Sequence, residues 1–235
     1  MLAITNHTFS LEAEDELAML GHRTLRLPPH PNLPSPVSSH PDMLLFFTPD
    51  AIFCTRSYYQ IANEELKEIS RVYGAPFQLI DAEYQNEYPL DVPLNALLLG
   101  KNLFCNTKTV ARELLELGLT PCHVNQGYAK CSTLPLGESA MITSDVSIAK
   151  KATDMGLDVL QIEAGHISLD GYDYGFIGGC ASFAPRKNIN TVFFHGDITN
   201  HPDYNRIYNF CVLHNYSVKG LSNIGLCDIG TIFMI

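Results

Sequence analysis

A helical pattern that ends at Gly or Asn and is followed by a β-rich segment recurs five times along the chain. A Gly or Asn in this position is typical of the left-handed residue that terminates a helix. The predicted helices span residues 10–21, 57–74, 107–118, 145–156 and 200–215. The β-rich segments that follow them span residues 22–27, 75–81, 119–124, 157–162 and 216–221.

Each predicted helix is also preceded by a short apolar segment that ends in small polar residues suited to a helix N-cap. These segments, predicted to be strands, span residues 3–9, 51–57, 102–109, 140–147 and 191–199. In four cases another predicted strand comes just before, over residues 43–49, 95–100, 127–135 and 175–183. The first unit lacks such a strand, and the apolar C-terminal segment 227–235 fills the place if it pairs with residues 3–5.

The resulting unit of two strands, a helix and a strand repeats with 38 to 59 residues between successive helix ends. Repeats of about 20 to 50 residues are typical of solenoids, propellers and arrays. A ring of five units, closed by the C-terminal strand, buries the terminus and covers the sheet edges. We therefore predict an α/β fold in which residues 1–235 form a single domain. An ordinary α/β sandwich is the alternative.

The composition is that of a globular protein, since 46% of the 235 residues are hydrophobic and 17% are charged. A net charge of −10 argues against a nucleic-acid partner, and it favours a cationic ligand unless the acidic surface only promotes solubility. Seven scattered cysteines without a CxxC pair indicate reduced thiols in a cytoplasmic protein. We expect no signal peptide, and no apolar run approaches the roughly 20 residues that span a bilayer.

Residues 124–170 resemble the core of dimethylarginine dimethylaminohydrolase and arginine deiminase, which belong to the pentein superfamily of guanidine-modifying enzymes. In these enzymes a strand, a turn, a second strand, a helix ending at Gly and a Val-rich strand precede a histidine, which here is His166. The chain is also similar to a bacterial branch of this fold that has no assigned function. The resemblance implies a five-bladed α/β propeller, with five ββαβ units around a pseudo-fivefold axis.

The same resemblance implies a set of site residues. A guanidinium carbon is a weak electrophile, so attack on it requires a thiolate and a cavity that holds the cation. Cys227 would be the nucleophile, because it lies near the C-terminus as in the family, and His166 would be the general acid and base. Carboxylates would hold the guanidinium nitrogens through charge-assisted hydrogen bonds. The candidate ligand-binding residues are Asp228, Asp42, Asp170, Asn125 and Gln126.

The chain also departs from the family pattern. Residues 125–128 read Asn-Gln-Gly-Tyr where the enzymes have an acidic residue and Gly-Gly-Asp, and amides cannot neutralise a guanidinium. Lys130 adds positive charge nearby. As alternatives, Cys227 is an ordinary buried thiol and His166 is a histidine satisfied by backbone groups. Asp228 is a stronger candidate, because an aspartate inside an apolar strand needs a partner.

Residues 195–203 contain a second group of polar side chains. Two histidines and two aspartates lie close together there and could bind a divalent metal ion. The alternative is structural, because a strand end and a helix start also require capping residues. The four residues are His195, Asp197, His201 and Asp203.

The segment 27–42 holds six of the fourteen prolines, and we predict an extended connection that either covers a cavity or lies on the surface. It ends in the motif His-Pro-Asp at residues 40–42, which we do not expect to precede a helix.

We conclude from the sequence that the protein binds a small polar ligand, with a guanidino compound as the first candidate, in an axial cavity. It is then either a hydrolase or amidinotransferase that uses Cys and His without a cofactor or metal, or a non-catalytic binding protein like the ribosome anti-association factor of the same fold. A metal-dependent hydrolase is a third alternative. We expect neither a nucleic-acid nor a membrane partner.

Overall fold

The strands form five separate sheets in the computed structural model, which describes residues 1–186 and 189–235. The first sheet contains, in spatial order, β12 (Ser182–Phe183), β15 (Ile232–Met234), β1 (Leu2–Thr5) and β2 (Arg23–Arg26). The others are β3 (Phe46–Phe47), β4 (Ile52–Thr55) and β5 (Phe77–Ile80); β6 (Leu97–Leu99), β7 (Asn102–Cys105) and β8 (Thr120–His123); β9 (Thr133–Leu136), β10 (Ala140–Thr143) and β11 (Asp158–Gln161); and β13 (Thr191–Phe194) with β14 (Ser217–Gly220).

Each sheet contains two parallel strands whose connection runs through at least one helix. The helices are α1 (Leu11–Met19), α2 (Pro41–Leu44), α3 (Arg56–Ile61), α4 (Asn63–Tyr73), α5 (Arg112–Leu115), α6 (Val146–Asp154) and α7 (Tyr204–Leu213). Short 3-10 turns are formed by Ser35–Val37 and Ile198–Asn200. Within the described ranges, every helix is too short or too polar to cross a membrane.

The five predicted helix ends are confirmed by the backbone. The residues concerned all have a positive φ, between 63° and 80°, and are Gly21, Gly74, Gly118, Gly156 and Asn215. Glycine adopts this left-handed conformation at little steric cost, and asparagine tolerates it better than most residues. The signal is therefore local, which explains why the sequence alone locates it.

The C-terminal strand completes the first sheet, as predicted. β15 runs antiparallel to β1, with Met234 opposite Ala3. Side chains alternate between the two faces of a strand. Ile232 therefore packs with Ala3 on one face, whereas the Phe233 ring lies 4.8 Å from the Phe47 ring on the other. The apolar terminus is thus buried on both faces.

Four predicted elements differ from the structure. Helix α5 begins five residues later than predicted, because the Asn106 side chain accepts a hydrogen bond from the Lys108 N–H and forms a turn that competes with the helix. The His-Pro-Asp motif at residues 40–42 does begin a helix, α2, so that expectation is wrong. Strand β9 begins only at Thr133, and the preceding residues form a loop.

The fourth difference lies in the fifth unit. Of the predicted strand 175–183, only β12 is formed, and it pairs with β15 rather than in a ladder with β13. Gly178 and Gly179 explain this, because added Cβ atoms there would lie 2.2 Å from the Thr133 carbonyl oxygen and 2.0 Å from Asp228 Oδ1. The chain turns at these glycines to pack tightly against its neighbours, which an extended strand would not do.

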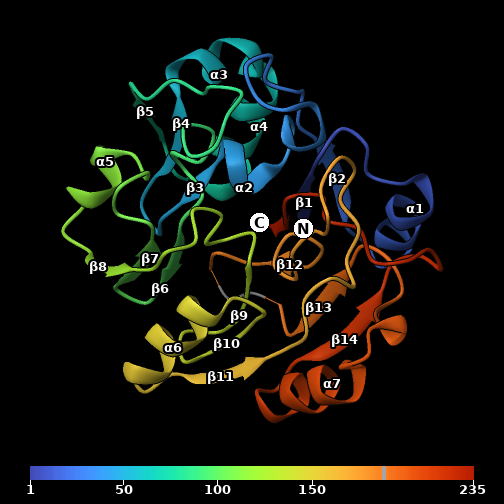
Figure 1. The fold of residues 1–235 in the computed structure, drawn as a ribbon. Helices are drawn as coiled ribbons and strands as arrows, with labels where there is room; N and C mark the ends of the chain where they lie inside the picture. The colour runs from blue at the N-terminus through green and yellow to red at the C-terminus, as the bar shows by residue number, and fades with distance from the viewer. Residues whose placement is uncertain (187–188) are drawn as a thin grey trace.

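The sheets surround the middle of the molecule, where both chain termini also lie (Figure 1). Helices α1, α3, α5, α6 and α7 lie toward the outside, whereas α2 lies closer to the middle (Figure 1). The Pro-rich segment 27–42 is largely buried, with Leu27, Leu33 and Val37 in the main hydrophobic cluster. It therefore contributes to the core, and its last turn leads into α2.

Asp145 caps the N-terminus of α6, and its replacement provides a test of this local design. Its side chain accepts hydrogen bonds from the Ile148 N–H and the Ser147 hydroxyl. We expect Asp145→Ala to lower the free energy of unfolding by about 1 kcal/mol, as measured by urea denaturation. The control is Asp154→Ala, which removes an exposed ion pair with Lys150 and should change stability by less than about 0.5 kcal/mol. Equal losses in the two variants would contradict the capping role.

Candidate functional site

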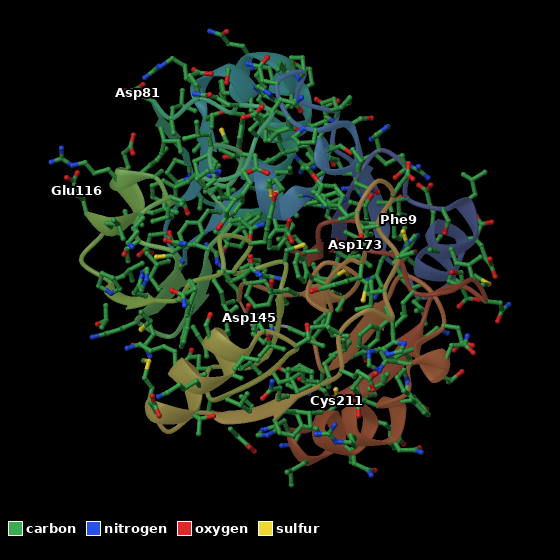
Figure 2. The ribbon with its side chains drawn as sticks, viewed as in Figure 1. Phe9, Asp81, Glu116, Asp145, Asp173 and Cys211 are labelled. Atoms are coloured by element: carbon green, nitrogen blue, oxygen red, sulfur yellow. The ribbon has the colours of Figure 1, made fainter. Side chains whose placement is uncertain are left out.

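A pocket of about 240 Å³ lies next to α2 and three loops. Apolar and aromatic side chains form most of its wall, and a few polar groups converge in it, as in many ligand sites. Its lining residues are Val37, His40, Met43, Gln126, Tyr128, Cys131, Leu169, Tyr172, Asp173, Tyr174, Phe176 and Asp228. Asp173 lies near the middle of the molecule in Figure 2, whereas Asp81 and Glu116 lie at its outer edge.

Asp228 is the buried acidic group of this pocket. Its carboxylate accepts hydrogen bonds from the Phe176 N–H at 2.8 Å and from the Gly230 N–H at 2.9 Å. A Cβ atom on Gly179 or on Gly175 would lie 2.0 Å or 2.4 Å from atoms of Asp228, so both positions require glycine. Gly175 and Gly179 therefore allow the backbone around Phe176 to pack closely against this carboxylate.

Cys131 and His40 lie beside Asp228. The Cys131 thiol is 3.2 Å from Asp228 Oδ2, to which it donates a hydrogen bond. Nδ1 of His40 is 3.8 Å from Asp228 Oδ1, and Nε2 is buried without a hydrogen-bond partner among the described residues. All three residues are at most 3% exposed. The structure thus assembles a thiol, an imidazole and a carboxyl group at one end of the pocket.

A second buried polar network lies next to the group formed by His40, Cys131 and Asp228. Lys130 donates a hydrogen bond from Nζ to the Thr231 hydroxyl at 2.8 Å, and Thr231 donates to Asp42 Oδ2 at 2.8 Å. The Asn95 amide donates to Asp42 Oδ1 at 3.3 Å, and its oxygen accepts from the backbone N–H groups of Lys130 and Cys131. Lys130 and Asp42 are therefore linked through neutral side chains.

Thr231 has a φ of 73°, which is unusual for a β-branched residue. Its hydroxyl also lies 2.8 Å from the Gly178 carbonyl oxygen, so the side chain is surrounded by polar partners. Backbone strain of this kind persists only where the surroundings fix it, and it often occurs at functional sites.

The electrostatics of the pocket follow from burial. Burial, followed by the nearby Asp42 carboxylate, raises the pKa of Asp228 to about 7, although hydrogen bonds to its carboxylate act in the opposite direction. Burial also raises the pKa of Asp42, whereas Lys130 lowers it. Burial likewise lowers the pKa of Lys130, against the effect of Asp42. Two buried carboxyl groups thus share one ammonium group.

The thiol and the imidazole are neutral for the same reason. Burial raises the pKa of the Cys131 thiol well above its usual range, and the Asp228 carboxylate adds to this effect. Burial lowers the pKa of His40 to about 3, with a smaller contribution from His7. Cys131 is therefore a protonated thiol at neutral pH, whereas a nucleophilic cysteine must be a thiolate.

Aromatic rings form the outer wall of the pocket. The Tyr128 ring stacks on Tyr88 with a centroid distance of 5.7 Å, and Phe176 lies 6.1 Å from both Tyr128 and Tyr174. Tyr172 and Tyr174 are each 41% exposed, so they mark the entrance. A pocket with aromatic walls and a carboxylate at its end suits a small cation.

The predicted catalytic pair lies elsewhere. Cys227 is partly buried and packs with the cluster around Phe9, and its N–H donates to the His195 carbonyl oxygen. His166 is exposed, with Nε2 3.3 Å from Glu163 and its ring 5.3 Å from that of His201. Among the described residues, neither Cys227 nor His166 lines the pocket.

The predicted ligand-binding residues divide into two groups. Asp228 and Gln126 line the pocket, and Asp42 is buried behind it. Asn125 is exposed and accepts a hydrogen bond at its carbonyl oxygen from Asn106, and Asp170 is also exposed.

The four residues of the alternative metal site have separate partners. Asp197 caps a 3-10 turn, and Asp203 accepts from the Glu163 N–H. Nδ1 of His201 accepts from the Asp203 N–H, whereas the buried His195 ring packs against Phe9. Among the described residues, the group of three or more potential metal ligands within 4.8 Å consists of His40, Cys131 and Asp228 instead.

Sequence reasoning missed Cys131 and His40 as site residues. They are separated by about ninety residues, and no local pattern connects them. The aromatic and glycine-rich stretch 172–179 was the available signal, because paired glycines indicate close packing around another group.

Comparisons with known proteins bear on the fold. A family model described as a family of unknown function (DUF6873) matches residues 4–233. The structure is similar to a cysteine-to-serine mutant of DDAH from Pseudomonas aeruginosa complexed with citrulline, with a TM-score of 0.52 and 13% identity over 93% of this chain and 91% of that chain. It is also similar to C. jejuni agmatine deiminase, with a TM-score of 0.50 and 8% identity over 94% and 75% of the two chains. A search of curated proteins finds no match.

Both solved structures belong to the pentein superfamily, so the resemblance seen in the sequence is confirmed at the level of the fold. The chain has a mixed α/β fold similar to that of pentein enzymes.

Proposed function

The chain belongs to the family of unknown function DUF6873, and we propose that it binds a small guanidino cation in the pocket that ends at Asp228. The observation that carries this proposal is a buried carboxylate without its own cation at the end of an aromatic pocket. The solved structure of DDAH with citrulline supports a small ligand for this fold. The acidic net charge of −10 also favours a cationic ligand.

The proposed ligand would complete the charges of the pocket. A guanidinium group at Asp228 would form charge-assisted hydrogen bonds with its carboxylate. Its planar faces would pack against Tyr128 and Phe176, where cation–π attraction adds to the contact. A pocket of about 240 Å³ has room for the guanidino group together with the carbon chain that carries it.

A second, more open depression of about 380 Å³ shares Gln126, Tyr174 and Phe176 with the pocket. Its other lining includes the polar side chains of Asn125, Ser144, Asp145 and Ser147. We propose that a polar tail of the ligand lies there while the guanidino group is held at Asp228. Asn125 and Gln126 would then contact this tail, in keeping with their predicted binding role.

The test is calorimetric titration of the metal-free protein with methylguanidinium and with methylurea, its neutral analogue of similar shape. We expect methylguanidinium to bind about 10- to 100-fold more tightly, because a hydrogen bond to a charged group contributes about 1.5–3 kcal/mol. Asp228→Asn should remove this preference, and the exposed Asp154→Asn variant should retain it. Equal affinity for the two compounds, or unchanged methylguanidinium affinity in Asp228→Asn, would contradict the proposal.

Catalysis is a separate prediction. Cys227 as nucleophile and His166 as acid and base stay our predicted pair, and Asp170 stays a candidate cation binder. Iodoacetamide labelling of the native protein from pH 5 to 9, with mass-spectrometric assignment, should modify Cys227 rapidly near neutral pH if it is catalytic, and more slowly in His166→Ala. Labelling of Cys227 only after unfolding would contradict the catalytic role, and only the binding function would then remain proposed.

The arrangement of the five sheets around a common axis is also a proposal. We propose that the five sheets are the blades of a pentein propeller, with residues 1–235 as one domain and the segment 27–42 as an internal connection. The pairing of β15 with β1 supports closure of the ring by the C-terminal strand.

A further inference from the structure

We propose that His40, Cys131 and Asp228 form a site for Zn²⁺ at the inner end of the pocket. One ligand atom from each of these residues lies within 4.8 Å of the others. Nitrogen, sulfur and carboxylate oxygen together are a ligand set that zinc commonly takes, whereas Mg²⁺ and Ca²⁺ prefer oxygen ligands alone. All three residues are buried, which distinguishes the group from a chance cluster on the surface.

The distances require only small movements. In a tetrahedral zinc site, bonds of about 2.0 Å to nitrogen and oxygen and about 2.3 Å to sulfur place the ligand atoms roughly 3.3–3.6 Å apart. Here Cys131 Sγ lies 3.2 Å and 3.5 Å from the two oxygens of Asp228, and His40 Nδ1 lies 3.8 Å from Oδ1. The three residues would supply three ligands, and the fourth position would face the pocket that they line.

The hydrogen bonding of His40 points to the same ligand role. The ring is buried, its Nε2 has no hydrogen-bond partner among the described residues, and its Nδ1 lies 3.8 Å from Asp228 Oδ1, beyond hydrogen-bond distance. A buried polar group without a partner is costly, and a native structure usually keeps it for a reason. A metal ion bound at Nδ1 would use a nitrogen lone pair that the protein leaves free.

The surrounding charges would also balance. Zinc binding replaces the S–H bond of Cys131 with a Zn–S bond, and the proton leaves to solvent. The site would then hold Zn²⁺ and the Lys130 ammonium group against three anions, which are Cys131, Asp228 and Asp42. The nearby Lys130 therefore does not prevent metal binding, because Asp42 already accompanies it through Thr231.

The zinc site goes beyond the proposed binding of an organic cation. Both ligands need the Asp228 carboxylate, so they would exclude each other. Only zinc needs the thiol of Cys131, which allows the two proposals to be tested separately.

The experiment is titration of the full, reduced chain with Co²⁺, whose thiolate charge-transfer band reports a metal–sulfur bond, followed by displacement with Zn²⁺. The wild type should bind one Co²⁺ per chain and release it to an equivalent of Zn²⁺. Cys131→Ser should lose the charge-transfer band and at least 100-fold in Zn²⁺ affinity, and His40→Gln should lose at least 10-fold. The control Cys211→Ser, which alters a thiol of α7 outside the pocket, should match the wild type.

Circular dichroism and urea unfolding would establish that each variant is folded. Unchanged Zn²⁺ binding in folded Cys131→Ser, or a charge-transfer band lost in Cys211→Ser instead, would overturn the site. If the wild type fails to bind one Zn²⁺ at micromolar free metal, the site is also overturned. Methylguanidinium binding by metal-free Cys131→Ser should persist in every case, and its loss would count against the proposed function rather than against the zinc site.

Discussion

Replacement of Lys130 by methionine is expected to lower the free energy of unfolding by about 3–5 kcal/mol at pH 8. The side chain is 3% exposed, and its ammonium group donates a hydrogen bond to Thr231. It also interacts electrostatically with the carboxyl groups of Asp42 and Asp228. Methionine preserves much of the packing against Phe183 but leaves two buried carboxyl groups without a cation. Urea unfolding, with attention to an unchanged m-value, would measure the loss.

Two controls separate charge from packing. The double variant Lys130→Met with Asp42→Asn removes an anion together with the cation, and we expect it to recover at least half of the lost stability. Lys219→Met removes an ion pair with Glu16 in which the side chains are 40% and 33% exposed, and it should cost less than about 1 kcal/mol. A loss below about 1 kcal/mol in Lys130→Met would show that the buried network does not depend on this ammonium group.

The features that were predictable from sequence are those with a local physical cause. The helix ends at Gly74 and Gly156 depend on a backbone conformation that the residue itself permits. The pairing of the C-terminal strand follows from its apolar character, because an exposed strand of this kind needs a partner. Asp228 was also recognisable, since a carboxylate within an apolar segment requires polar neighbours.

The rest of the site depends on contacts that the local pattern does not encode. Cys131 reaches Asp228 across 97 positions of the chain, and His40 meets both only because α2 begins at a motif that looked like part of a loop. In the sequence, Lys130 adds a positive charge that is expected to disfavour a cation nearby. The structure instead pairs it with Asp42 through Thr231, which leaves Asp228 available.

The second large expected effect concerns how the free energy of unfolding depends on pH. The contributions of Asp228 and His40 to this free energy change with pH in opposite directions. The pKa of Asp228 is about 7 in the folded protein, above its ordinary value of 3.8, so the unfolded chain loses this proton first and stability falls as pH rises from 4 to 7. The pKa of His40 is about 3, below its ordinary value of 6.5, so the unfolded chain takes up this proton first and stability rises from pH 3 to 6.5. The two contributions oppose each other where they overlap.

In the wild type the two contributions largely cancel, so a variant at either residue should show a pH dependence of the free energy of unfolding that the wild type lacks. Between pH 4 and 6.5 each contribution amounts to about 3 kcal/mol. Relative to the wild type, metal-free Asp228→Asn should gain about that much stability across this range, whereas His40→Gln should lose about that much. The other titratable groups near the pair are present in both variants, so their contributions largely cancel in the comparison; they are His7, Asp42, Lys130, Cys131 and Cys180.

Urea unfolding at pH 4, 5, 6 and 7 with a chelator would measure the three profiles. Divergence of the two variants in opposite directions would establish that a buried carboxyl group and a buried imidazole titrate against each other beside the pocket. Parallel profiles would mean that Asp228 and His40 keep their ordinary pKa values, and the pocket would then lack the uncompensated carboxylate on which cation binding depends. The stability measurement therefore bears directly on function, because the group that costs the free protein stability above pH 4 is the one that a bound cation would neutralise.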